Sequence, residues 1–177
     1  DLTDSDFTGA DLAGAQLADC TLTGATFRNA KLAGAMLGRV RAATTDFTAA
    51  DLEGAVMDGG DFQKSDFRTA RLPRVHAVDA DLSECILERI VLQTSRLDRC
   101  RLVYSDLSYA TLERSSLLDA DLGYANLHGI TERDVVWHGA NLKGAQRTDP
   151  ARLQAETWRP PADETEPPSK TQSPTRP

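Results

Sequence analysis

Large apolar residues recur at every fifth position along most of this chain. The frame runs from Leu2 to Leu142, and its clearest stretch is 105–125, SDLSYATLERSSLLDADLGYA. Each unit holds a small residue, a polar residue, a large apolar residue at its centre and two further residues that are mostly polar. The centre positions that depart from this rule are Ala42, Ala77 and Glu132. So strict a period indicates a repeat architecture.

A period of five fits neither an α-helix nor a flat strand. On a helix, at about 100° per residue, successive centres would be rotated by roughly 140° and would scatter around the axis. On a flat strand, successive centres would point to opposite faces. All centres can face inward only if the chain turns a corner in every unit. The sequence therefore predicts a solenoid of short parallel strands, with coils stacked about 4.8 Å apart.

The phenylalanines indicate how many sides each coil has. Phe7, Phe27, Phe47 and Phe67 are twenty residues apart, which is four units. A four-sided coil stacks these rings in one interior column, whereas a three-sided coil would scatter them. Stacked rings contribute about 0.5–1.5 kcal/mol per pair beyond their buried area. We therefore expect four sides.

The units ADLEG, ADLSE, SDLSY, ADLGY and ANLKG resemble the A(D/N)LXX signature of the pentapeptide repeat family. The resemblance covers residues 1–145. It implies an all-β fold, a right-handed quadrilateral parallel β-helix of about seven coils. The handedness follows from the resemblance alone. Because Asp1 already lies inside a repeat, we also expect the natural chain to begin before it.

The repeat pattern weakens toward the C-terminus. Glu132 stands where a buried leucine is expected, so we expect this unit to bulge outward. In 146–158, Asp149 is a good N-cap and Pro150 suits the first helical position, which predicts a short capping helix with Leu153 and Trp158 docked on the last coil. Residues 159–177 hold six of the eight prolines, which predicts a disordered tail.

Composition limits the kinds of partner and the cellular location that we expect. The net charge is −7, so a nucleic-acid backbone is an unfavourable partner. The sequence has no apolar run long enough to span a bilayer and no signal peptide, so we expect no membrane partner and a cytoplasmic location. Cys20, Cys85 and Cys100 all fall on the small inward position, and we interpret them as buried thiols without a disulfide.

The sequence has no recognisable catalytic chemistry. Many residues just before the centres are aspartates, which we interpret as solvated positions that keep the rod soluble. His76, His128 and His138 do not have the spacing of metal ligands. There is no glycine-rich phosphate loop, Gly-x-Ser-x-Gly elbow or Cys-x-x-Cys motif. We therefore predict no catalytic residue, no metal site and no cofactor.

We predict a non-catalytic protein–protein interaction or scaffold module whose partner is another protein, with a second copy of the chain as one alternative. One of the four sides has no aspartate before its centres, and it is called the aspartate-free side below. Exposed apolar residues tend to mark interaction sites. The predicted partner-binding residues on this side are Met36, Val56, His76, Arg96 and Leu118. A second candidate surface consists of Tyr104, Tyr109 and Tyr124.

Two other functions remain open. The resemblance implies that the rod could mimic DNA and protect DNA gyrase or topoisomerase from quinolones or toxins. The acidic first coil suits this reading, but Lys31, Arg41, Arg71 and Arg101 interrupt the acidic columns. The rod could also be the C-terminal domain of a larger bacterial accessory protein, for example one that serves type VI secretion.

Overall fold

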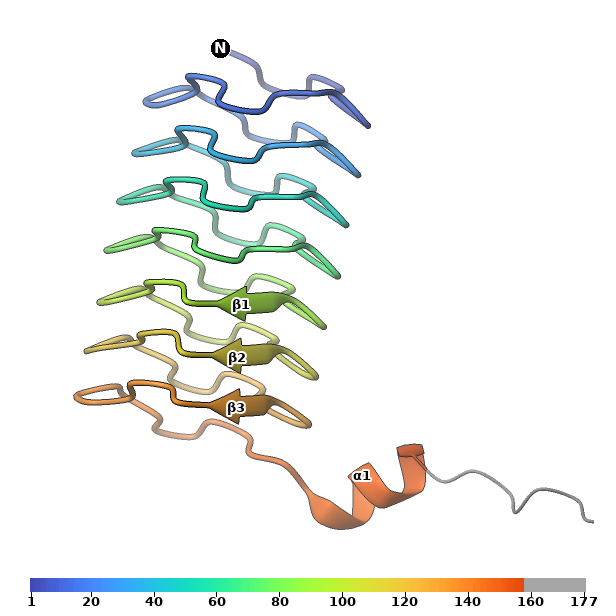
Figure 1. The fold of residues 1–177 in the computed structure, drawn as a ribbon, viewed down its shortest axis with the longest axis vertical. Coiled ribbons are helices and arrows are strands. Elements are labelled where there is room, and N and C mark those ends of the chain that lie inside the picture. Colours follow the sequence, from blue (N-terminus) through green and yellow to red (C-terminus); the bar gives the residue numbers. More distant parts are fainter. Residues whose placement is uncertain (158–177) are drawn as a thin grey trace, which may run out of the picture.

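The backbone of the computed structural model turns a corner after every fifth residue, and four such sides complete one coil (Figure 1). The structure describes residues 1–157. Parallel bridges join residues that are twenty apart in the sequence, such as Asp6 with Thr26 and Thr26 with Asp46. The chain coils in a right-handed sense from its N-terminus downward (Figure 1). The predicted right-handed quadrilateral β-helix is therefore confirmed.

Most sides form a single bridge, because a five-residue side leaves little room for a longer strand between two corners. Regular strands form on one side of three successive coils: β1 (Val91–Gln93), β2 (Thr111–Glu113) and β3 (Thr131–Arg133). They build a parallel sheet in the order β1-β2-β3. One helix, α1 (Pro150–Thr157), follows the repeats.

Each corner uses a residue in the left-handed backbone region. These residues occupy the second position after every centre, from Asp4 (φ 54°) to Gly144 (φ 71°). Many of them are not glycine, and this conformation costs roughly 1–2 kcal/mol for a residue with a Cβ. The corner is held because its N–H donates to the next coil. The N–H of Tyr104, for example, donates to the carbonyl of Gly123 at 3.0 Å.

The interior is a set of stacked apolar columns. Phe7, Phe27, Phe47 and Phe67 stack with ring centroids 4.8 to 5.2 Å apart and nearly parallel planes. Phe62 meets the Phe47 and Phe67 rings edge-on from a neighbouring column. The phenylalanine column and the four-sided coil are as the spacing predicted.

Interior hydroxyls replace a backbone bond at some corners. The small residue that opens a unit usually donates its N–H to the preceding centre, as Ala50 does to Phe47 at 3.0 Å. The N–H of Val75 instead donates to the hydroxyl of Ser95, and that of Ser95 to the hydroxyl of Ser115. The Ser95 hydroxyl in turn donates to the carbonyl of Leu72. These buried serines are therefore hydrogen-bonded, which removes the cost of burying them.

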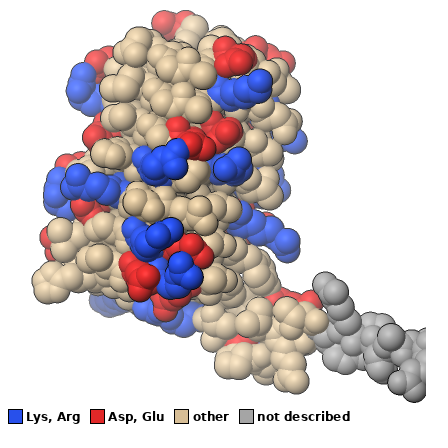
Figure 2. Space-filling model, in the orientation of Figure 1, with Lys and Arg blue, Asp and Glu red and all other residues tan. Residues whose placement is uncertain are grey.

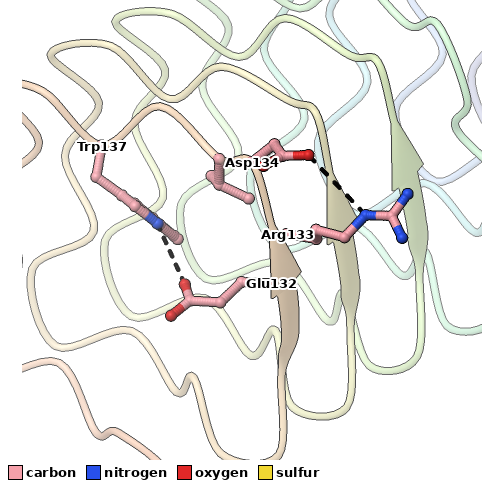
Figure 3. A pocket seen from close by; sticks show the side chains of 5 residues that line it. Glu132, Arg133, Asp134 and Trp137 are labelled. Carbon is pink, nitrogen blue, oxygen red and sulfur yellow. Dashed lines mark hydrogen bonds and ion pairs between the residues drawn. The ribbon is translucent and has the colours of Figure 1, made fainter.

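Glu132 stays in register, so the predicted bulge is wrong. It lies in β3 opposite Leu112. Its carboxylate accepts a hydrogen bond from Trp137 Nε1 at 3.2 Å (Figure 3) and lies 4.0 Å from Arg147 Nη1. The side chain is 45% exposed. A carboxylate at the centre position is tolerated here because the described residues form no further coil that would enclose it.

Helix α1 is capped as its sequence indicates, since Asp149 Oδ1 accepts the N–H groups of Ala151 and Arg152. Its docking differs from our expectation. Leu153 is only half-buried, and polar contacts to the side of the rod hold the helix, mainly through Glu156. Trp158 and the tail 159–177, which we predicted to be disordered, lie outside the described residues.

Candidate interaction surfaces

Aspartates before the centres bind the backbone of their own corner. Outside strands β1–β3, the N–H of the residue after a centre has no backbone acceptor in the ladder of coil-to-coil bonds. Asp46 Oδ1 accepts this N–H from Thr48 at 2.8 Å. The same bond is made by Asp1, Asp6, Asp11, Asp51, Asp61, Asp66, Asp81, Asp106, Asp121, Asn126 and Asn141. Besides keeping the rod soluble, the role that we assigned to them, these aspartates therefore also satisfy a backbone donor.

Neighbouring arginines compensate part of the acidic columns. Asp46 and Asp66 are bridge partners in successive coils, so their like charges lie close together. Arg28 pairs with Asp46 at 3.0 Å, and Arg68 pairs with Asp66. Partial burial disfavours the Asp46 carboxylate, but hydrogen bonds from Thr48 and Arg28 outweigh it and hold the pKa of Asp46 below its ordinary value.

The aspartate-free side forms one continuous column, as predicted. Bridges join Met36 to Val56, Val56 to His76 and His76 to Arg96. Met36 and Val56 are half-buried, whereas His76 and Arg96 are exposed. Leu118 is half-buried on the same side. The predicted residues therefore lie near one another on one side of the rod, and those nearest the N-terminus, Met36 and Val56, are apolar.

Two acids on the aspartate-free side are hydrogen-bonded to other groups of the rod. Asp58 Oδ1 accepts the N–H of Val78 in the next coil at 2.8 Å. Asp98 is almost fully buried and accepts hydrogen bonds from Arg96, at 3.1 Å, and from the Ser116 hydroxyl. Burial alone would raise the pKa of Asp98, but these hydrogen bonds outweigh it and lower the pKa. Both carboxylates are therefore held by the rod itself, and Asp98 is also paired with Arg96.

The three tyrosines gather near the C-terminal end of the rod. Tyr104 and Tyr124 stack at one corner, with ring centroids 5.1 Å apart. Tyr109 lies at the next corner, edge-on to the ring of His128. Ile86, which the sequence reasoning missed, is exposed on the side between these corners. Its signal was an isoleucine in a column whose other members are all polar. Ile86 and the three tyrosines are called the tyrosine patch below.

Glycines in the following coil make room for two of these rings. A Cβ added at Gly129 would lie 2.7 Å from the ring of Tyr109, and one at Gly144 would lie 2.6 Å from the ring of Tyr124. Both rings therefore lean toward the C-terminal end of the rod and cover the glycine backbone. Tyr104 is 62% exposed and Tyr124 is 49% exposed, so both remain open to a partner.

The remaining surface of residues 1–157 combines mixed charges with a pocket beside β3. Acidic and basic side chains are interspersed on the face in Figure 2. A pocket of about 290 Å³ beside β3 is lined by Glu132, Arg133, Asp134, Val135 and Trp137 (Figure 3). Among the described residues, no cluster of three or more histidine, cysteine or acidic side chains could hold a metal ion. No helix within 1–157 is long and apolar enough to cross a membrane.

The cysteines are free thiols in the structure. Cys85 and Cys100 are buried, and Cys20 is half-buried. Burial raises the pKa of Cys85 and of Cys100 to about 12. These two thiols are therefore protonated at neutral pH and cannot serve as nucleophiles.

Solved structures with a similar chain are themselves pentapeptide repeat proteins. Rfr23 from the cyanobacterium Cyanothece 51142 is 24% identical over 59% of this chain and 60% of its own, with a TM-score of 0.38. The chain thus spans less than two thirds of that protein. QnrB1, a plasmid-mediated fluoroquinolone resistance protein, is 17% identical over 86% of this chain and 82% of its own, with a TM-score of 0.49. HetL from the cyanobacterium Nostoc, a protein involved in heterocyst differentiation regulation, is 27% identical over 82% of this chain and 76% of its own, with a TM-score of 0.25.

No curated protein sequence matches the chain. The model of the pentapeptide repeats, in contrast, matches eight copies within residues 1–39, 37–74, 50–89, 78–108 and 95–131. Together these segments cover residues 1–131, well over half of the chain. The protein therefore belongs to the pentapeptide repeat family.

Proposed function

We propose that this protein is a non-catalytic rod that binds another protein through its aspartate-free side. The family is generally a non-enzymatic structural and interaction fold. The observation that carries the proposal is the column of Met36, Val56 and His76, which is aligned by bridges in three successive coils. Asp58, the acid that lies beside it, is bonded to the backbone of Val78.

Desolvation favours this side over the other three. The core of a protein interface is depleted in charged residues, because a buried charge must lose its water. On the other sides a partner would have to cover the carboxylates of columns such as Asp46 and Asp66. On the aspartate-free side it would cover Met36 and Val56 instead. From Met36 to Ser116 the column spans five coils, or roughly 19 Å at the usual strand spacing, which is long enough for several contacts.

The DNA-mimic alternative has less support. The aspartates before the centres already bind a backbone N–H, as Asp46 binds that of Thr48. Several are also paired with arginines, including Asp46 with Arg28 and Asp81 with Arg101. Both contacts reduce the negative field that would imitate DNA. We therefore expect no protection of DNA gyrase from ciprofloxacin in a supercoiling assay.

Site-specific cross-linking tests the proposed face. A photo-reactive amino acid in place of the exposed His76 should capture a partner in cells that produce the protein, and mass spectrometry would identify it. The same group at Arg71, which is exposed on the neighbouring side, is the matched control and should capture little. Equal capture from both positions would contradict the proposal.

Two substitutions separate the aspartate-free side from an acidic face. Val56→Asp places a charge in the apolar column and should abolish capture from position 76. Asp66→Asn removes a charge on the opposite side but keeps the oxygen that accepts the N–H of Arg68, so capture should persist. If only Asp66→Asn weakens the complex, the partner binds an acidic side of the rod, and the DNA-mimic function is favoured. Light scattering of the purified protein would show whether the captured partner is a second copy of the chain.

A further inference from the structure

One border of the aspartate-free side carries opposite charges in a fixed order. This border, called the charged edge below, is the row of corner residues Asp19, Arg39, Gly59, Asp79 and Arg99. Successive residues of the edge lie one coil apart, because each corner N–H donates to a carbonyl of the next coil. The four charged side chains are all exposed. Toward the C-terminus the edge is therefore negative, positive, neutral, negative and positive.

Ion pairs within the rod hold these four charges in place. Arg39 donates to Asp19 from Nε at 2.9 Å and from Nη2 at 2.7 Å. Arg99 makes the same two bonds to Asp79, at 2.7 and 2.8 Å. Exposed ion pairs add little to the stability of a fold. Their two-bond geometry does fix where each charge lies, so the edge is preorganised for a partner with the complementary order of charges.

The order of charges on the edge is complementary to itself when it is reversed. If a second copy of the rod lies antiparallel with Gly59 facing Gly59, Arg39 faces Asp79 of the second copy and Asp19 faces its Arg99. Each charge then has an opposite charge beside it in its own rod and another across the interface. The next corner residue, Asp119, lies outside this overlap. A parallel copy in register would instead place every charge opposite an identical one.

The rest of the aspartate-free side suits the same twofold arrangement. Because the column is aligned by bridges, the axis that passes Gly59 also brings Val56 to Val56 and Met36 to His76 of the second copy. On the other border of the side, Gly34 would face Arg74 of the second copy. A Cβ added at Gly34 would meet no atom within 4 Å, so there is open space for this long side chain. The arrangement therefore covers the apolar column without a steric conflict at either border.

Asp58 is the acid that this arrangement must accommodate, because its two copies would lie near the axis. Its Oδ1 accepts the N–H of Val78 at 2.8 Å, so the carboxylate is turned toward the next coil of its own rod. In an antiparallel pair the next coils of the two rods lie in opposite directions. The two carboxylates therefore turn away from each other, which limits their repulsion.

We propose that the partner of the aspartate-free side is a second copy of this chain, docked antiparallel with the twofold axis at Val56 and Gly59. This inference rests on the proposed function, because both use the same side of the rod. The overlap from Asp19 to Arg99 spans five coils, or roughly 19 Å, so the interface is small and the dimer is weak. Dimer formation rises with protein concentration and falls with added salt, because salt screens the exposed charges.

Sedimentation equilibrium of the full chain tests the arrangement. Arg39→Glu places a like charge opposite Asp79 of the second copy at both ends of the interface, and should raise the dissociation constant about tenfold. Asp79→Arg should have a similar effect. The double variant should regain most of the loss, because it restores opposite charges across the interface. Residues 39 and 79 are two coils apart in one rod, roughly 10 Å, so this recovery can arise only between copies. Additive losses in the double variant would overturn the antiparallel arrangement.

Lys64→Glu is the matched control for the charge reversals. Lys64 pairs with Glu84 of the next coil at 3.7 Å, on the corner that carries Tyr104 of the tyrosine patch and does not border the aspartate-free side. The substitution breaks an ion pair of the same kind and should leave the dissociation constant unchanged. An equal loss in this control would refute the role of the charged edge. Asp58→Asn keeps the acceptor for Val78 but removes the remaining repulsion, so it should tighten the dimer.

The outcome for the dimer can be separated from the outcome for the proposed function. A chain that remains monomeric in the most concentrated solutions would overturn the dimer. If the photo-reactive group at His76 then still captures another protein, the proposed function stands and only the identity of the partner is wrong. A monomer that captures nothing from this position would overturn both.

Discussion

Asp46 and Thr48 are joined across the buried Phe47 by a hydrogen bond of 2.8 Å from the Thr48 N–H to the Asp46 carboxylate. The coil-to-coil ladder leaves this N–H without a backbone acceptor, as it does the N–H of Thr45, which donates to the hydroxyl of Ser65. Aspartate and asparagine have a side-chain oxygen at the right reach for a bond two residues onward. The bond therefore explains physically why these two residues precede so many centres.

Asp46→Ala should lower the free energy of unfolding by about 1 kcal/mol beyond the loss of the ion pair with Arg28, because it also leaves the Thr48 N–H without its acceptor. This exceeds the roughly 0.5 kcal/mol expected of an ordinary surface change. Asp46→Asn keeps the acceptor and should lose only the ion pair with Arg28, about 0.2–1 kcal/mol. Urea melts of the two variants would measure the difference. If Asp46→Ala unfolds at the same urea concentration as the natural protein, the bond contributes nothing.

Phe47→Ala should cost far more, about 3–5 kcal/mol, because it opens a cavity in the phenylalanine column. Phe47 stacks between Phe27 and Phe67 and meets the edge of Phe62. Phe47→Leu should be milder, since leucine occupies most other centres of the rod. The same urea melts provide the comparison. A loss for Phe47→Ala that is no larger than that for Asp46→Ala would mean that the column is not the source of stability.

The period of five was enough to predict the fold, because inward and outward positions follow directly from it. It also placed Phe27 over Phe47 and Tyr104 beside Tyr124, since residues twenty apart must be neighbours. The period could not show that Glu132 remains in register. That depends on whether another coil encloses the position, and the sequence pattern does not specify this.

The candidate surfaces were predictable in part. The column of Met36, Val56 and His76 is aligned as expected. The role of Asp58 was missed because periodicity assigns a side chain to the outside without showing which backbone N–H lacks a partner there. The docking of α1 was also missed. It depends on Glu156 meeting Tyr109, a polar contact that no apolar pattern indicates.

The corners predict a pair of opposite substitutions. Thr94 and Gly34 both occupy left-handed corners, with φ of 57° and 67°. A Cβ at Gly34 would meet no atom within 4 Å, so only backbone strain would oppose a larger residue there. Gly34→Thr should therefore lower stability by about 1 kcal/mol, and Thr94→Gly should raise it by about as much. Thermal melts measured side by side would check the signs. Two shifts in the same direction would refute the strain argument.

The thiols should differ in reactivity. Burial raises the pKa of Cys85 and of Cys100 to about 12, so neither forms an appreciable amount of thiolate at pH 8. Cys20 is half-buried and should react first with a disulfide reagent such as DTNB. All three should react rapidly once urea unfolds the rod. Fast reaction of Cys85 in the folded protein would show that the interior opens more readily than the structure implies.

Glu156 should make the docking of α1 sensitive to acid. Hydrogen bonds from Tyr109, Arg152 and His128 lower the pKa of Glu156 to about 2 in the docked state, below its ordinary value of 4.5. The carboxylate therefore supports docking fully above pH 4.5, and this support is lost as the pH falls through about 2.

At the alkaline end, the same bond raises the pKa of Tyr109, so the support from its neutral hydroxyl is present below pH 10 and is lost as the pH rises above that value. The acid transition of Glu156 can be followed by NMR. The signals of the Gly129 and Ala151 amides should remain in their docked positions at pH 5 and shift between pH 4 and 2. Glu156→Gln keeps an oxygen that can accept the Tyr109 hydroxyl but cannot titrate, so it should abolish the acid-induced shift while other carboxylates still titrate. If the variant shows the same acid transition, another group controls the docking of the helix.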